Sequence, residues 1–276
     1  MNDKIMAARA ALHMWEEPCI SGTKGSGAVF FSGCGLRCCF CQNHDIAIGS
    51  RGRAVSVERL GEIFLELKEK GAANINLVTG AHYVPQIIEA LDMARRNGLD
   101  IPVVYNSSGY EKTETLKLLE GYVDIYLPDL KYLDPELAQK FSYAPDYVQA
   151  AKAAIGEMVR QTGKCEFGED GYIRKGTIVR HMILPGHTGN SIKALRYLHE
   201  TYGEDIYISI MNQYTPVRKF VEFKELNRKV TKREYEKVLD AAVDMGIQNG
   251  FIQEGETASE SFIPDFDYEG VEKNTP

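Results

Sequence analysis

The chain has 276 residues, 44% of them hydrophobic, which is enough to bury the core of one large α/β domain. Its formal net charge of −7 argues against a general nucleic-acid partner, because binding phosphates requires a basic surface. No apolar run approaches the roughly 20 residues of a membrane span, the N-terminus has no signal-peptide core, and the cysteines indicate a reducing compartment, so we expect a cytoplasmic protein without a membrane partner.

Strand-like and helix-like segments alternate along most of the chain. We predict an irregular lead-in at residues 1–26, a main domain at 27–254, and an acidic tail at 255–276 that wraps the surface. Short apolar runs predict strands at 27–32, 74–78, 101–105, 122–127, 177–184 and 206–210, with an edge strand at 251–252. Apolar residues at helical spacing predict helices at 56–70, 85–97, 113–120 and 144–161 and two more that start at 190 and 231, while the polar segment 163–176 is predicted to be a hairpin or loop.

Capping residues mark several of the predicted helix starts. Ser56 and Asn190 can each cap a helix, and Thr231 with Glu234 forms a capping box. Strands that alternate with helices form a parallel sheet joined by right-handed crossovers, with the helices on one side. About six βα units are too few for a closed eight-stranded barrel, so we predict an α/β fold, an open partial (β/α)6 barrel with a largely parallel sheet.

The loop after the first predicted strand reads SGCGLRCCFCQNHD over residues 32–45. Cys34, Cys38 and Cys41 stand there in the spacing C-x3-C-x2-C, and a short loop can aim three thiolates at one point. Thiolates are the ligands of Fe–S clusters, and a cubane cluster normally takes four of them. Three ligands would leave one iron open for chemistry.

Other interpretations of these cysteines compete with the cluster. Cys38 and Cys41 form a C-x2-C pair, which could be half of a zinc site or a redox pair. Zinc needs a second pair, whereas Cys19 and Cys165 are single and distant in the sequence. We interpret Cys19 as a packed thiol near the cluster, because a fourth cysteine ligand would abolish the open iron.

The segment CGLRCCFCQN, with the aromatic Phe40 before its last cysteine, resembles the signature loop of the radical S-adenosylmethionine (SAM) superfamily. Arg37, Asn43 and Asp45 around it resemble the activating enzymes of glycyl radical enzymes, such as the pyruvate formate-lyase activase. The segments 15–22 and 262–266 resemble an activase-like branch of the same superfamily more closely. The resemblance implies a partial barrel and a 4Fe–4S cluster on Cys34, Cys38 and Cys41, with S-adenosylmethionine as cofactor. It also implies a reducing electron donor such as flavodoxin or ferredoxin, and a glycyl radical enzyme as protein substrate.

Polar loops follow the predicted strands, and the carboxyl ends of parallel strands are where such folds bind ligands. We therefore expect a ligand ring made of the cysteine loop, Thr79-Gly80, residues 106–109, Asp129-Leu130-Lys131 and His187. The residues predicted to bind the cofactor are Phe40, Thr79, Gly80, Asn106, Ser108, Asp129 and Lys131.

The resemblance sharpens some of these roles. Asp129-Leu130-Lys131 matches a cofactor-contacting segment of the activase, in which Asp129 would accept hydrogen bonds or hold a cation and Lys131 would pair with the cofactor carboxylate. Arg180 matches an arginine on a late strand of the activase. The chain departs from the family after two strands, because residues 79–81 replace Gly-Gly-Glu and residues 106–109 replace Asp-Thr-Asn-Gly.

Three functions are carried forward from the sequence. The first is reductive cleavage of S-adenosylmethionine and removal of a hydrogen atom from a glycyl radical enzyme. The second is the same radical chemistry on a small molecule or peptide. The third is a non-catalytic metal or redox protein that uses Cys38 and Cys41. No carboxylate pair or Ser/His/Asp set suggests an acid–base catalyst, so no catalytic side chain is assigned.

Overall fold

The computed structural model describes residues 4–253 and 264–272 and contains one ten-stranded sheet. Its strands follow the order β10-β9-β8-β6-β5-β4-β2-β1-β3, with β7 paired to β8 beside this path. Seven strands pair in parallel: β2 (Ser26–Phe31), β4 (Ile75–Val78), β5 (Val103–Ser107), β6 (Ile125–Pro128), β8 (Ile173–Met182), β9 (Tyr207–Met211) and β10 (Gly250–Ile252). The strand order runs from β10 at one edge to β3 at the other, so the sheet does not close on itself and the barrel is open. The predicted fold class is confirmed.

The sequence predicted an irregular lead-in at residues 1–26, but the described part of it, residues 4–26, contains regular structure. Residues Ile5–His13 form strand β1, which pairs antiparallel with β2 on one side and with β3 (Arg53–Val55) on the other. The alanine-rich segment has a single β-branched residue, Ile5, and little intrinsic preference for a strand, so its strand conformation follows from pairing with β2 and β3. A short helix, α1 (Pro18–Ser21), follows β1.

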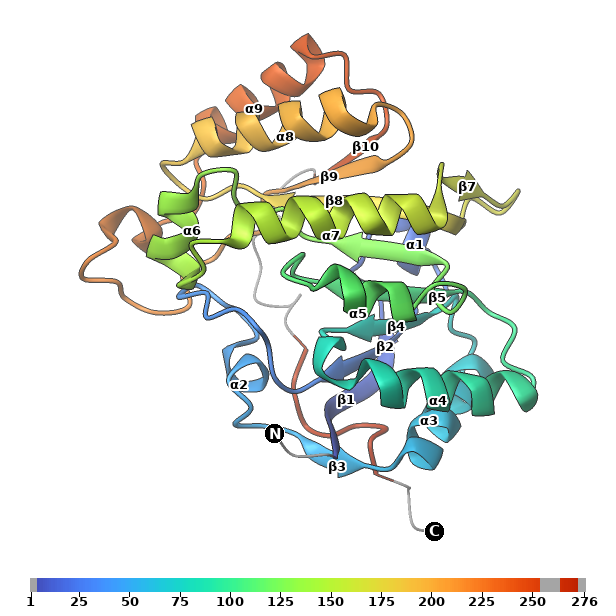
Figure 1. Cartoon of the computed structure of the whole chain (residues 1–276). Coiled ribbons are helices and arrows are strands. Elements are labelled where there is room, and N and C mark those ends of the chain that lie inside the picture. Colours follow the sequence, from blue (N-terminus) through green and yellow to red (C-terminus); the bar gives the residue numbers. More distant parts are fainter. Residues whose placement is uncertain (1–3, 254–263, 273–276) are drawn as a thin grey trace.

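Helices cover one face of the curved sheet, as Figure 1 shows for α4, α5, α7 and α8. The longer helices are α3 (Val57–Glu69), α4 (Val84–Arg96), α5 (Thr113–Leu118), α6 (Pro135–Ser142), α7 (Tyr147–Thr162), α8 (Thr188–Tyr202) and α9 (Lys232–Asp244). The shorter ones are α2 (His44–Ala47) and the 3-10 turns η1 (Ala81–Tyr83) and η2 (Lys224–Asn227). Helix α6 was missed by the sequence analysis, although Asp134 caps it and Pro135 opens it.

Two of the predicted caps are present and one is wrong. The Ser56 hydroxyl accepts a hydrogen bond from the Arg59 amide, and Thr231 forms a capping box with Glu234. Asn190 lies inside the first turn of α8 and instead bridges the loop after β6, where its side chain donates to the Lys131 carbonyl and accepts from the Leu133 amide. The polar segment 163–176 is the predicted hairpin, because β7 (Glu166–Phe167) pairs antiparallel with β8.

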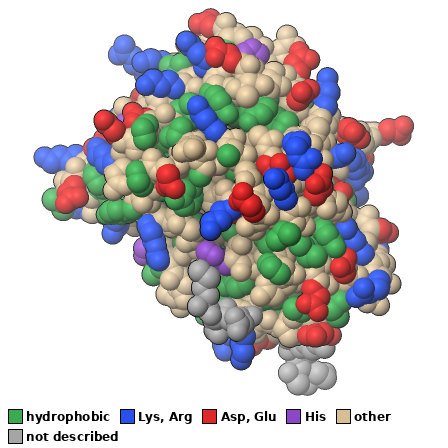
Figure 2. Space-filling model, in the orientation of Figure 1, with side chains coloured by type: hydrophobic (Ala, Val, Ile, Leu, Met, Phe, Trp, Pro, Cys, Tyr) green, Lys and Arg blue, Asp and Glu red, His purple; other side chains and the backbone are tan. Residues whose placement is uncertain are grey.

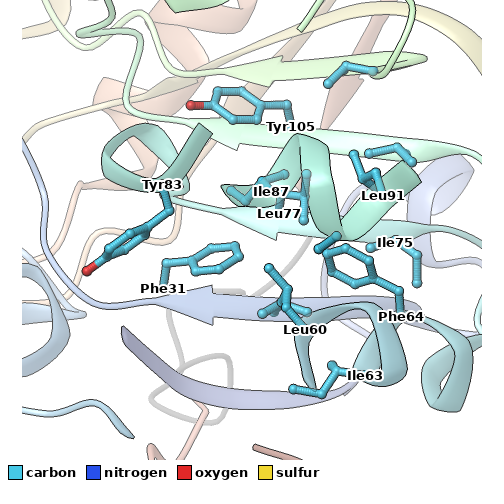
Figure 3. Packing of buried hydrophobic residues seen from close by; sticks show 14 of the residues in the cluster. Phe31, Leu60, Ile63, Phe64, Ile75, Leu77, Tyr83, Ile87, Leu91 and Tyr105 are labelled. Atoms are coloured by element: carbon cyan, nitrogen blue, oxygen red, sulfur yellow. The ribbon is translucent and has the colours of Figure 1, made fainter. Parts of the chain in front are cut away.

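The main core lies between α3, α4 and the strands β2, β4 and β5. Figure 3 shows Leu60 and Phe64 of α3 and Ile87 of α4 packed over Phe31 and Leu77 of the sheet, and all five side chains are buried. Burying such side chains contributes roughly 1.5–3 kcal/mol each, so this layer fixes the frame on which the strand-end loops are mounted.

A separate cluster fills the inside of the barrel at the α1 end. Cys19 and Ile20 of α1 pack there against Val104, Ile125 and Ile178, which point inward from β5, β6 and β8. Helix α1 also lies beside the β7–β8 hairpin, where the Tyr172 hydroxyl accepts from the Thr23 amide (Figure 1). The end of the barrel where the parallel strands begin is therefore closed by a packed plug.

The described part of the tail lies along β1. The Ala10 amide donates to the Glu269 carbonyl, the Tyr268 amide donates to the Ala8 carbonyl, and Arg9 forms ion pairs with Asp267 and Glu269. The predicted boundary at residues 254–255 lies outside the described residues. Basic and acidic side chains are interspersed on the face seen in Figure 2. Within residues 4–253 and 264–272, no helix combines the length and apolar character needed to cross a membrane.

Candidate functional site

The loops at the carboxyl ends of the parallel strands surround one cavity of about 400 Å³. The three predicted cluster ligands lie on its wall together with most of the predicted cofactor ring. These residues are Cys34, Cys38, Phe40, Cys41, Thr79, Asn106, Ser108, Asp129 and Lys131. Residues that are up to 97 positions apart in the chain are thus brought to a single site by the parallel sheet.

The cysteine loop is anchored on the carboxyl end of α6. The Cys39 amide donates to the Phe141 carbonyl at 2.8 Å, and the Ser142 hydroxyl donates to the Cys38 sulfur at 3.0 Å. The Phe40 ring is buried between Phe141 and Tyr214, at centroid distances of 6.5 and 6.1 Å. Hydrogen bonds to ligand sulfur tune the potential of Fe–S clusters, so Ser142 would tune a cluster that Cys38 ligates.

Burial affects the charge state of the cysteine thiols. It raises the pKa of Cys41 to about 12 and also raises the pKa of Cys34, so both are neutral at pH 7 unless a bound cation replaces the proton. Cys39 is half-buried and does not line the cavity, which agrees with the register that assigns the ligands to its neighbours.

Within the described part of the chain, no three His, Cys, Asp or Glu side chains converge on a single metal ion. A cubane cluster does not require such convergence, because each thiolate binds a different iron. The donor set fits a cluster of that kind: three thiols share one cavity wall, and the opposite rim carries ionisable side chains suited to a polar ligand.

The loop after β6 carries a buried ion pair into the cavity. Lys131 Nζ lies 2.6 Å from Asp129 Oδ2, and Arg180 Nε donates to Asp129 Oδ1 at 3.0 Å. Burial alone would raise the pKa of Asp129, but the Lys131 and Arg180 cations outweigh it and hold that pKa below its usual value. Asp129 is therefore a carboxylate at neutral pH, and it fixes the position of Lys131.

Arg180 connects this pair to the other strands. Its guanidinium donates to Asn106 Oδ1 at 2.6 Å and to Glu16 Oε2 at 3.1 Å, in addition to Asp129. Glu16 Oε1 in turn accepts from the side-chain amides of Asn76 and Asn106, each at 3.1 Å. The network thus joins β4, β5, β6 and β8 to the segment before α1.

Two further residues, Tyr147 and His181, hold the backbone of the Asp129–Lys131 loop. The Tyr147 hydroxyl accepts from the Lys131 amide at 2.9 Å and lies 2.9 Å from the Asp129 carbonyl. His181 Nδ1 donates to the Leu130 carbonyl at 2.6 Å, which leaves Nε2 as the acceptor for Ser191. Burial lowers the pKa of His181 to about 4, so this tautomer is uncharged at pH 7.

Two residues after β4, Thr79 and Gly80, were predicted to bind the cofactor, and only Thr79 lines the cavity. Thr79 lines the cavity with φ at +62°, a left-handed conformation that is rare for a β-branched residue. Gly80 is not on the cavity wall, since a Cβ there would point at Ile87 in the core. Its role in binding the cofactor remains a prediction without support from the cavity geometry. His187 also lies off the wall, packed on Phe141.

The sequence analysis did not select the acidic residues Glu16 and Glu17. They lie, with Arg180, on the part of the cavity wall that we call its floor. Glu16 and Glu17 both line the cavity, whereas the cysteine it selected from the same segment, Cys19, packs into the plug with Ile20. Cys19 is a packed thiol, as predicted. It packs with the side chains around α1, however, and not with the hydrophobic side chains that contact the cysteine loop. The adjacent pair of acidic residues after an apolar segment was the available signal.

A model of the radical SAM superfamily matches residues 28–198, which is more than half of the chain. The chain belongs to this superfamily. Membership implies an enzyme whose cofactors are a 4Fe–4S cluster and S-adenosylmethionine.

Two curated relatives are similar to the chain. An uncharacterized protein of Methanocaldococcus jannaschii is 27% identical over 238 residues, which cover 84% of this chain and 65% of the relative. The pyruvate formate-lyase-activating enzyme of Clostridium pasteurianum is 27% identical over 113 residues, which cover 39% of this chain and 46% of that enzyme. In both cases the chain spans less than two thirds of the relative's length.

Solved structures share the fold at low sequence identity. Streptococcus suis SuiB bound to precursor peptide SuiA superimposes with a TM-score of 0.54 at 15% identity, covering 82% of this chain and 47% of that one. The FeFe-hydrogenase maturase HydG from Carboxydothermus hydrogenoformans gives a TM-score of 0.53 at 13% identity, covering 86% and 56%. At such identities, the likeness concerns the fold alone.

Proposed function

We propose that this protein cleaves S-adenosylmethionine reductively and removes a hydrogen atom from a substrate held in the same cavity. The observation that carries the proposal is the arrangement of Cys34, Cys38 and Cys41 with Asp129 and Lys131 around one space of about 400 Å³. When bound, the cluster supplies one electron that splits S-adenosylmethionine into methionine and a 5′-deoxyadenosyl radical, which takes the hydrogen atom.

The residues of the chain hold and orient the reactants in this proposal. The three cysteines would ligate the cluster, and Lys131 would pair with the carboxylate of S-adenosylmethionine while Asp129 keeps its ammonium group in place. Phe40, buried beside the cysteines, contributes apolar surface that excludes water from the reacting atoms. Positioning, rather than proton transfer by a side chain, is the contribution of the protein.

A glycyl radical enzyme is the substrate that we propose first. The sheet is open, so the cavity has a lateral mouth that the surface of a bulky partner can complete. A glycine Cα carries no side chain and can approach closely, and the matched segment of the Clostridium activase supports this class. We include flavodoxin or ferredoxin as electron donor and, because all six cysteines are free thiols, a cytoplasmic location.

Radical chemistry on a small molecule or peptide is the second candidate. It is favoured by the extent of the matches, since 84% of the chain aligns with an uncharacterized relative but only 39% with the activase. Of the positions at which the chain departs from the activase, Thr79 and residues 106–108 line the cavity, where activase-like residues would be expected.

The experiment is anaerobic reconstitution with iron and sulfide, reduction with dithionite, and measurement of 5′-deoxyadenosine by mass spectrometry. We expect slow formation that requires both reductant and S-adenosylmethionine. Candidate glycyl radical enzymes are then added, and a glycyl doublet in electron paramagnetic resonance supports the first substrate class. Deuterium transfer from a labelled small molecule or peptide into 5′-deoxyadenosine, with no doublet, selects the second. If no cleavage occurs with a fully loaded cluster, the proposal is wrong.

A further inference from the structure

The floor of the cavity holds a buried carboxyl group that is only partly satisfied. Glu17 directly precedes α1, is 8% exposed, and lines the cavity. Its Oε2 atom is buried and has no hydrogen-bond partner, and the Ser209 side chain lies near enough to the carboxyl group to lower its pKa in part. A buried carboxyl oxygen without a hydrogen-bond donor costs free energy, so a ligand that donates to Oε2 would be favoured at this position.

The nearest cation does not neutralise Glu17. The Arg180 guanidinium already donates to Asp129, Glu16 and Asn106. The ion pairs formed among the described residues include Arg180–Glu16 at 3.1 Å but none to Glu17. Arg180 therefore lowers the cost of the Glu17 charge only through longer-range attraction.

The charged side chains around the floor balance only when Glu17 is neutral. The buried set made of Glu16, Glu17, Asp129, Lys131 and Arg180 holds three acidic and two basic side chains. His13 lines the same cavity, but burial lowers its pKa to about 4 and it adds no positive charge at pH 7. Glu17 is the acidic side chain of this set without an ion pair, and burial raises its pKa, which favours the neutral carboxyl group until a cation lies beside it.

The location of Glu17 separates it from the cysteine loop. Helix α1 contacts the β7–β8 hairpin at the end where the parallel strands begin, and the loop between β2 and α2 lies at the opposite end of the strands (Figure 1). In the proposed function, the methionine part of the cofactor lies beside Lys131 and the cysteines. Glu17 instead lies beside Ser209 of β9, below that position.

We propose that Glu17 binds a cationic nitrogen of the substrate, an alkylammonium or guanidinium group. This inference rests on the proposed function of the cavity and names the substrate class that it accepts. Such a group would donate to Oε2 and supply the countercharge with which Glu17 binds it as a carboxylate. Met182, Met211 and Phe251 line the same cavity and provide apolar contacts for the aliphatic stem that carries the nitrogen.

The test compares charged probes with neutral probes of the same shape. Isothermal calorimetry would measure n-butylguanidinium against n-butylurea, and n-butylammonium against n-butanol, on the reconstituted full chain with S-adenosylmethionine present. We expect the charged member of at least one pair to bind about 10- to 100-fold more tightly. Glu17→Gln should remove that preference, and Glu157→Gln, which changes a glutamate on α7 away from the cavity, should retain it. The pair that responds identifies the nitrogen as guanidinium or ammonium.

Two further measurements separate a binding role from a structural one. Glu17→Gln should leave the thermal midpoint unchanged or raise it, because it replaces an unpaired buried carboxyl group with a neutral group of equal shape. A clear drop in the midpoint would instead assign Glu17 to folding. If Glu17→Gln weakens S-adenosylmethionine itself and not the probes, Glu17 belongs to the cofactor site and the inference is overturned.

Formation of 5′-deoxyadenosine without any substrate distinguishes this inference from the proposed function. If wild type and Glu17→Gln both cleave the cofactor but neither prefers a charged probe, only the substrate inference fails. If neither cleaves it, the proposed function fails, whatever the probes show.

Discussion

The wall and the floor of the cavity are built in different ways. The wall that carries Cys34, Cys38 and Cys41 comes from one short loop, held by backbone contacts to α6. The floor around Arg180 draws one or two residues from each of several strands that are far apart in the sequence. A contiguous motif can be identified from sequence spacing, whereas a dispersed network becomes visible only when the strands are placed side by side.

The two regions also differ in what they contribute to the fold. The cysteine thiols make few interactions without metal, so their value lies in binding. At the floor, Arg180, Glu16, Asp129 and Lys131 are buried charges that pair with one another, and breaking such a set leaves uncompensated charge in a low-dielectric interior. Changes to the wall should therefore abolish metal binding and activity, while removal of the central cation of this network should reduce stability.

The largest effect is expected from the wall. Replacing Cys34, Cys38 or Cys41 with Ala should reduce iron from about four per chain to near zero and abolish 5′-deoxyadenosine formation, because each thiolate binds one iron. Cys39→Ala is the matched control, and it should retain both, since Cys39 does not line the cavity. Iron analysis and mass spectrometry check this. Loss of the cluster in Cys39→Ala but not in Cys34→Ala would show that the ligand register is wrong.

Removing the central cation tests the floor. Arg180→Met leaves Asp129 and Glu16 without their shared partner and should lower the free energy of unfolding by about 3–5 kcal/mol. Arg174→Met, which breaks an exposed ion pair with Asp170, should cost roughly 0–1 kcal/mol. Urea unfolding measures both. Equal, small losses would mean that the network is not a stabilising unit.

The pH dependence of stability tests the support of the Asp129–Lys131 loop. Burial lowers the pKa of His181 to about 4, below its unfolded value near 6.5. The stability that this histidine provides is therefore complete above pH 6.5 and is lost as the pH falls toward 4, by up to about 3 kcal/mol. His181→Gln should flatten the curve in that window, whereas His44→Gln, at an exposed position, should not. Parallel curves for wild type and His181→Gln would contradict the assignment.

A smaller effect is expected from Lys131, on the affinity for S-adenosylmethionine. Lys131→Ala should weaken S-adenosylmethionine binding by roughly 1.5–3 kcal/mol, about 10- to 100-fold in Kd, the worth of a charge-assisted hydrogen bond. Lys152→Ala, on the outer face of α7 over Tyr197, is the control. Equilibrium binding to the reduced protein measures both variants. Unchanged affinity in Lys131→Ala would place the cofactor carboxylate elsewhere.

The smallest effect concerns backbone strain beside the wall. Thr79→Gly should raise the free energy of unfolding by about 1 kcal/mol, because glycine adopts a positive φ without the steric cost that Thr79 bears. Glycine is also the residue that the family motif carries first at this point. A loss of stability in urea would show that the Thr79 side chain makes a compensating contact.

The sequence predicted the parallel strands and the cysteine wall because local patterns determine both. It failed for β1, because an alanine-rich segment takes its strand conformation from β2 and β3 rather than from its own preferences. Asn190 shows the same limit: a residue typical of a helix cap serves the loop after β6 instead. Glu16 and Glu17 became functional candidates only once α1 was seen to fill the barrel beneath the cavity.

The most direct test of the account is whether the cluster has an iron that the protein leaves free. Electron paramagnetic resonance of the reduced, reconstituted protein should be recorded before and after addition of S-adenosylmethionine. The account predicts that the cofactor changes the g-values of the reduced 4Fe–4S signal in wild type and in Cys39→Ala. A cluster signal that S-adenosylmethionine leaves unchanged in wild type would contradict the claim that Cys34, Cys38 and Cys41 hold a cluster open to the cofactor.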